Sequence, residues 1–115
     1  MSSKYEITRH ESGGGTIIIW IRLVPDGGLA VTDYSYGPAA DVFYGTGHGV
    51  ESSLALEPDA VRRLHTLLAD RDDPDPADKL ARRLVKMFSG DTLALRKIRN
   101  LCDEHDIEYD KALWV

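Results

Sequence analysis

The sequence has little of what builds secreted or membrane proteins. It contains a single cysteine, Cys102, so no internal disulfide can form, and this suits a reducing compartment. Its most apolar run, residues 16–24, is well short of the roughly 20 apolar residues that a membrane helix needs. No apolar stretch follows the initial Met-Ser-Ser-Lys, which predicts that there is no signal peptide. We therefore expect a cytoplasmic protein that makes no use of a membrane.

Length and composition indicate an ordinary globular protein. A chain of 115 residues fits one domain over residues 1–115 and should bury roughly 65% of its unfolded surface. With 43% hydrophobic and 29% charged residues, the composition is neither that of a disordered chain nor that of a membrane protein. The net charge of −5 argues against nonspecific binding to nucleic acids or membranes, which are themselves negative.

Residues 16–24 form the run around which we expect the fold to be organised. Side chains alternate across a strand, so every second residue shares a face. One face is entirely aliphatic and should point into the core: Ile17, Ile19, Ile21 and Leu23. The other face is mixed: Thr16, Ile18, Trp20, Arg22 and Val24. Because β-branched residues also favour the extended backbone, this run predicts a central strand.

A hairpin is predicted directly after this strand. Residues 25–28, Pro-Asp-Gly-Gly, separate it from a second β-like run at 29–36, and Asp-Gly favours the positive φ angles of a tight turn. A two-residue loop at Asp26-Gly27 pairs Trp20 with Asp33. A bulged loop that includes the second glycine instead shifts the register by one residue and swaps the faces of the second strand.

Alternation and helical periodicity extend this interpretation to the whole chain. They predict further strands at 4–11 and 50–56, and helices at about 58–69 and 77–88, with a third starting at Asp91. The expected fold is α+β, an antiparallel four-stranded sheet with two to three helices packed on one face. Residues 1–56 would form a β-meander, and residues 57–115 a helical part with an acidic connector at 70–78.

Two glycine-rich segments are candidates for functional loops. A phosphate loop places its glycines between a strand and a helix, whereas residues 12–15 lead into a strand and favour a simple turn. Residues 37–49 carry four further glycines with Tyr44 and His48, and loops of this length are often functional. The alternative is a loop held down by its own aromatic side chains.

No motif in the sequence demands an enzyme, a metal or a cofactor. The four histidines lie on unrelated elements. Cys102 and His105 have a Cys-x-x-His spacing, but no second metal-binding pair accompanies them. His65 lies near the apolar edge of its helix, where packing is the simpler role. The sequence therefore indicates a non-enzymatic protein.

One helix face is strongly basic. Its four cations follow helical spacing and share one side of the 77–88 helix: Lys79, Arg82, Arg83 and Lys86. The face is either solvated, neutralising the acidic segments beside it in sequence, or a docking site for an acidic protein or nucleic acid.

The mixed face of the central strand supplies the leading hypothesis. Tryptophan, arginine and aliphatic groups together are typical of protein-binding patches. The predicted interface residues are Trp20, Arg22, Val31, Asp33, Tyr44 and His48. We expect a small interaction or regulatory protein that binds another protein or forms a homodimer. The alternatives are nucleic-acid binding through the basic helix face and a small enzyme that uses residues 37–49.

From Asp33 onward, the chain resembles a family of small bacterial and phage-encoded proteins of unassigned function. The resemblance rests on an acidic strand residue, a Gly-Pro-Ala loop with an aromatic-Gly pair, a helix and a His-x-Ile-x-Tyr stretch before a tryptophan: Asp33, Gly37–Ala39, Tyr44-Gly45, residues 59–68, His105–Tyr109 and Trp114. It implies no activity or binding residue. The order of four strands and a helix is also similar to the single-stranded-DNA-binding transcriptional coactivators. However, residues 1–56 have three basic residues against six acids, which is unlike a groove for DNA.

Overall fold

The computed structural model describes residues 4–13, 15–37, 49–69 and 76–114. In these ranges the chain forms five strands and three helices. In chain order they are β1 (Lys4–Ser12), β2 (Gly15–Leu23), β3 (Leu29–Tyr36), β4 (Val50–Leu56), α2 (Pro58–Ala69), α3 (Pro76–Phe88), α4 (Ala94–Glu104) and β5 (Asp110–Trp114). None of the helices in this described part is long and apolar enough to cross a membrane.

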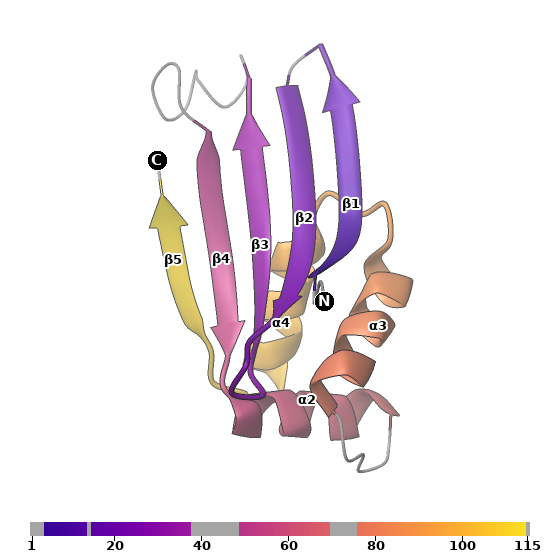
Figure 1. The fold of residues 1–115 in the computed structure, drawn as a ribbon, viewed down its shortest axis with the longest axis vertical. Coiled ribbons are helices and arrows are strands. Elements are labelled where there is room, and N and C mark those ends of the chain that lie inside the picture. Colours follow the sequence, from indigo (N-terminus) through magenta and orange to yellow (C-terminus); the bar gives the residue numbers. More distant parts are fainter. Residues whose placement is uncertain (1–3, 14, 38–48, 70–75, 115) are drawn as a thin grey trace.

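The strands form one antiparallel sheet in the order β1-β2-β3-β4-β5. In Figure 1, α4 lies behind the sheet, α3 stands at its lower right next to β1, and α2 crosses its lower end. The predicted α+β fold with an antiparallel sheet is therefore confirmed. The predicted number of four strands is wrong, because the C-terminal residues return to the sheet and pair with β4 as a fifth strand.

A single apolar core fills the space between the sheet and the helices. The aliphatic face predicted for the central strand points into it, since Ile19 and Ile21 are completely buried. Val61 and Leu64 of α2 and Leu80 of α3 meet them there, each completely buried. Burying each such side chain contributes roughly 1.5–3 kcal/mol. His65 is also buried, as expected of a packed histidine.

The β2–β3 register differs from the one that a two-residue loop requires. Ile19 lies opposite Asp33, and Trp20 opposite Thr32, one residue away from that prediction. The turn explains the shift: Gly27 N donates to Val24 O at 3.0 Å, and Val24 N donates to Gly28 O at 3.0 Å. The loop between Val24 and Gly28 is thus one residue longer, with Gly27 at φ 95°.

This shift swaps the two faces of β3. Leu29 and Val31 now face the helices and are completely buried. Asp33 lies between Ile19 and Ser52 on the same helix-facing side. The backbone also fixes the turn against β4, because a Cβ at Gly28 would come within 2.7 Å of the Leu56 carbonyl oxygen.

A bulge in β1 attaches the sheet edge to the turn between α3 and α4. The β1–β2 register shifts between Glu6 and Thr8, which leaves Ile7 without a partner on β2. The Ile7 carbonyl accepts a hydrogen bond from Gly90 N at 3.1 Å. The Thr8 hydroxyl donates to the Asp91 carbonyl at 3.0 Å. These bonds hold the helices against one side of the sheet.

Candidate functional site

The side of the sheet opposite α3 and α4 is here called the helix-free face, and it faces the viewer in Figure 1. Cross-strand partners share a face, so the register assigns its members. From β1 to β5 they are Lys4, Glu6, Arg9, Glu11, Thr16, Ile18, Trp20, Arg22, Ala30, Thr32, Tyr34, Tyr36, Glu51, Ser53, Ala55, Asp110 and Ala112. This face includes Trp20 and Arg22 of the predicted interface.

The middle of the helix-free face is apolar and aromatic. Ile18 and Trp20 lie on β2, and Tyr34 and Tyr36 on β3. The rings of Tyr34 and Tyr36 are 5.4 Å apart between centroids and tilted by 43°. Tyr34 also lies over Gly49, where a Cβ would collide with its ring. The absence of a side chain at Gly49 therefore leaves room for the Tyr34 ring beside the start of β4.

Two cations lie together at the lower end of this face. Lys4 and Arg22 are register partners on adjacent strands. The Lys4 ammonium lies 4.3 Å from the centre of the Trp20 ring, within cation–π range. The third cation of the face is already paired, since Arg9 Nε lies 3.0 Å from Glu6 Oε1. Lys4 and Arg22 make no ion pair with a described carboxylate.

Two other predicted interface residues are not on this face. Val31 is completely buried in the core because the register shift turns its side chain away from the helix-free face. Asp33 lies on the helix-facing side, not beside Trp20 as predicted. Burial raises the pKa of its carboxyl above the ordinary 3.8, while a 3.3 Å hydrogen bond from Ser35 acts in the opposite direction. Tyr44 and His48 lie outside the described residues.

The basic face of α3 is partly occupied by partners of its own. Arg82 Nε lies 3.0 Å from Asp78 Oδ2, and Asp78 also accepts a hydrogen bond from the Tyr5 hydroxyl. This chain of contacts ties α3 to β1. Arg83 and Lys86 are exposed. The basic face of α3 therefore serves in part to hold α3 against β1.

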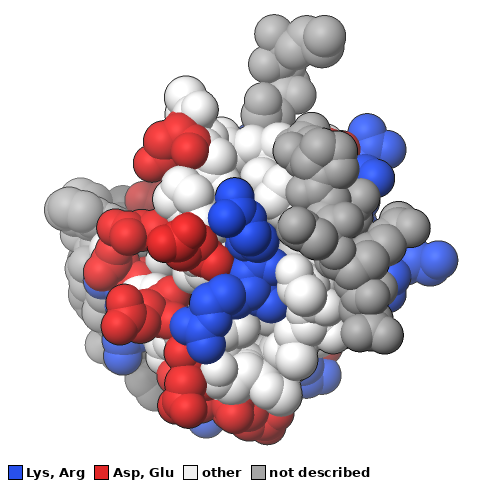
Figure 2. Space-filling view, turned by 90° about the horizontal axis from the view of Figure 1, so that it is seen from below, with Lys and Arg blue, Asp and Glu red and all other residues white. Residues whose placement is uncertain are grey.

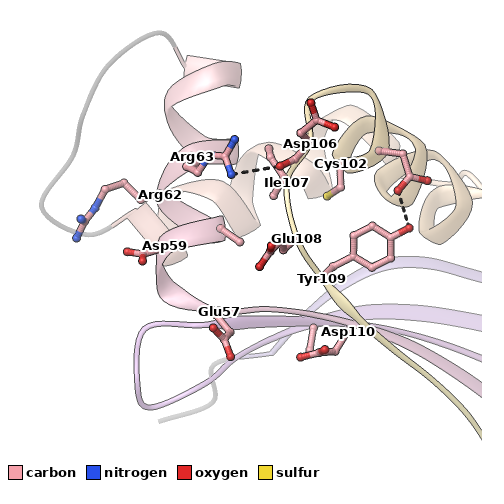
Figure 3. Close-up of a pocket in the computed structure, with 13 residues that line it drawn as sticks. Glu57, Asp59, Arg62, Arg63, Cys102, Asp106, Ile107, Glu108, Tyr109 and Asp110 are labelled. Atoms are coloured by element: carbon pink, nitrogen blue, oxygen red, sulfur yellow. Dashed lines mark hydrogen bonds between the residues drawn. The ribbon is translucent and has the colours of Figure 1, made fainter.

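A groove of about 980 Å³ opens at the lower end of the molecule, between α2 and the segment that joins α4 to β5 (Figure 3). Six acidic and two basic residues line it: Glu57, Asp59, Asp103, Asp106, Glu108, Asp110, Arg62 and Arg63. Seen from below, acidic side chains gather on one side of this end, next to a stripe of basic ones (Figure 2). The sequence indicates the acids of this tail but not the groove that folding forms around them.

One wall of this groove is the C-terminal end of α4. Ile107 N donates to Cys102 O at 2.9 Å and Asp106 N to Asp103 O at 3.5 Å, which is the Schellman pattern of helix termination. Asp106 takes the left-handed conformation, φ 53°, that this motif needs. Arg63 Nη1 donates to the Asp106 carbonyl at 3.2 Å and so fastens the helix end to α2 (Figure 3).

The cysteine of this groove is not an activated nucleophile. Cys102 lines it but is completely buried, and burial, assisted by the charge of Asp103, raises the pKa of its thiol to about 11. The thiol is therefore protonated at neutral pH. His105, the other residue of the Cys-x-x-His spacing, is exposed. No group of three histidine, cysteine or acidic side chains in the described ranges is arranged to hold a metal ion.

Comparison of the chain with protein-family models, with curated proteins and with solved structures finds no match.

Proposed function

We propose that this chain is a non-enzymatic protein that acts by binding another protein through the helix-free face of its sheet. The observation that carries the proposal is the chemistry of that face. An antiparallel sheet with helices on one side normally presents polar side chains on the other. Here the outward positions include Ile18, Trp20 and Tyr34, all only half-buried.

The size of the face supports this role. Five strands at about 4.8 Å spacing and strand lengths of about 25 Å give a surface on the order of 600 Å². A stable protein–protein interface buries roughly 800 Å² on each partner, and accessible area exceeds the flat area of a pleated surface. The helix-free face is therefore large enough to form most of one interface without further elements.

The charges of the face indicate the chemistry of the partner. Like charges directly across a strand pair are unfavourable, so Lys4 and Arg22 lie together at some cost. An acidic group on the partner would remove that repulsion, and the partner's apolar surface would cover Trp20. A second copy of the chain is one such partner, because Glu11 and Glu51 lie at the other end of the same face.

The experiment compares the oligomeric state and the captured binding partners of matched variants. Trp20→Ala and Arg22→Ala alter the proposed face, whereas Leu93→Ala and Arg83→Ala remove an exposed apolar and an exposed basic side chain from the helical side of the molecule. Light scattering after size-exclusion chromatography gives the oligomeric state of each. Capture from extracts of the native cells then compares the proteins retained by each variant.

Two results support the proposal. One is a wild-type dimer that becomes monomeric in Trp20→Ala but not in Leu93→Ala. The other is a captured protein that is lost with both face variants and kept with both control variants. If the four variants behave like the wild type in both measurements, the helix-free face is not the binding surface.

Nucleic-acid binding through α3 is the weaker alternative. The Arg82–Asp78 ion pair supports a structural role for part of the basic stripe, and the net charge is negative. Binding to DNA or RNA that weakens steeply with added salt and is lost in Arg83→Ala would favour this alternative. The enzyme alternative depends on His48, which lies outside the described residues, and gains no support.

A further inference from the structure

A second pocket lies on the helix side of the sheet, between α4 and the β4–β5 edge. It has a volume of about 370 Å³, within the lower range of sites that hold small molecules. Leu54 of β4 and Leu95 of α4 supply apolar surface to its lining. The same lining includes Ser52, Arg99 and Lys111. The pocket is thus both apolar and polar, as ligand sites commonly are.

The strand register explains why these polar groups meet. Lys111 of β5 pairs with Leu54 of β4, which faces the helices and is 2% exposed. Ser52 lies two residues before Leu54 on the same strand and therefore on the same side. Arg99 approaches from α4, which packs against β4. Three separate elements thus bring a hydroxyl, a guanidinium and an ammonium to one pocket.

The charge of the pocket is opposite to that of the chain. The protein carries a net charge of −5, yet no acidic residue is part of this lining. Neither Arg99 nor Lys111 makes an ion pair with another residue that the structure describes. Two cations gathered in a recess repel each other, and the repulsion is relieved when an anion binds between them.

We infer that this pocket binds a small anionic molecule, with a phosphate or carboxylate group between Arg99 and Lys111 and an apolar part against Leu54 and Leu95. The guanidinium can donate two parallel hydrogen bonds to such an oxyanion, and the ammonium adds a point charge. The Ser52 hydroxyl is a further donor. The inference is independent of the proposed role of the helix-free face, which lies on the other side of the sheet.

The test is an NMR titration of the isotope-labelled protein at constant ionic strength. The probes are phenyl phosphate, benzoate and inorganic phosphate, which separate the contributions of the headgroup and of the apolar part. We expect saturable shifts of the amide signals around Ser52, Arg99 and Lys111. Stronger binding of phenyl phosphate than of benzoate assigns a phosphate headgroup, and the reverse order assigns a carboxylate; either order supports the inference.

Matched variants test whether the probes bind in this pocket. Arg99→Gln and Lys111→Gln should each weaken the best probe by about tenfold, the usual effect of losing a charged hydrogen bond. Arg96→Gln is the control, because Arg96 is an exposed cation of the same helix outside the lining. It should leave affinity within about twofold. Retained spectral dispersion establishes that each variant is folded.

Two outcomes would overturn the inference. One is the absence of saturable shifts with all three probes at millimolar concentration. The other is an equal loss of affinity in Arg96→Gln and Arg99→Gln, which would indicate general charge attraction and not a site.

Discussion

The Lys4 ammonium lies 4.3 Å from the centre of the Trp20 ring, on the face of the sheet that no helix covers in Figure 1. This contact brings a cation and the largest aromatic side chain together on an outward surface. It also joins the edge strand β1 to its neighbour β2.

Removing the Lys4 ammonium should weaken the fold slightly. Lys4→Gln should lower the free energy of unfolding by about 0.5 kcal/mol, since the cation–π contact is exposed. Urea unfolding of Lys4→Gln, Trp20→Leu and the double variant measures their coupling. Lys86→Gln, an exposed cation of α3, serves as the control and should have no effect. A coupling energy of zero would show that the contact contributes nothing.

Asp33 should make stability depend on pH in the acid range. Burial raises the pKa of its carboxyl above 3.8, so the folded state holds the proton more tightly than the unfolded state. The stability that Asp33 gains from holding this proton is therefore present below pH 3.8. It is lost as the pH rises through the pKa of the folded state. Asp33→Asn should raise the free energy of unfolding at pH 7 by on the order of 0.5 kcal/mol, a figure reduced for solvent screening.

Urea unfolding of the wild type and Asp33→Asn at pH 7 and near pH 4 checks this prediction. The advantage of the variant should shrink toward the lower pH, because the wild-type carboxyl then becomes neutral as well. An advantage that grows on acidification would contradict the assignment of a raised pKa.

The thiol of Cys102 should be unreactive in the folded protein. It is completely buried, and burial raises its pKa to about 11, so the reactive thiolate is scarce at neutral pH. Ellman's reagent should therefore label it only as fast as the protein unfolds. Labelling rates should rise in parallel with the unfolded fraction in urea. Rapid labelling without urea would mean that the groove beside Cys102 opens readily.

Two backbone positions of positive φ should respond oppositely to exchange between glycine and a larger residue. Asp106 has φ 53° at the end of α4, so Asp106→Gly should stabilise by about 0.5 kcal/mol. Gly90 has φ 79° and open space where a Cβ would lie, so Gly90→Ala should destabilise by about 1 kcal/mol through the backbone alone. Thermal unfolding of both variants measures these signs. Equal shifts in the same direction would contradict the account of the helix end.

The central strand and its aliphatic face could be predicted from sequence because alternation needs no knowledge of the partner strand. The turn could not be fixed in the same way. Its register depends on the Val24–Gly28 hydrogen bond and on the Asp26 carboxylate, which accepts from Gly28 N at 2.8 Å. Since one residue of shift exchanges the faces of β3, a two-residue loop places Val31 and Asp33 on the wrong side.

The fifth strand could not be predicted for a different reason. Residues 110–114 are short and begin with Asp110 and Lys111, so their composition has little strand propensity. What makes them a strand is the free edge of β4, which the helices bring within reach of the C-terminal segment. The same pairing forms the pocket with Lys111. Tertiary contacts of this kind leave no local pattern in the sequence.

Photo-crosslinking tests the central claim most directly. A photoreactive phenylalanine analogue would replace Ile18 on the helix-free face or, as a control, Leu93, which is 51% exposed outside that face. After irradiation in the cells that naturally make the protein, gel mobility and mass spectrometry identify covalent adducts. We expect an adduct with another protein, or with a second copy of the chain, from position 18 and none from position 93. An adduct from position 93 alone, or none from either position, would contradict this expectation.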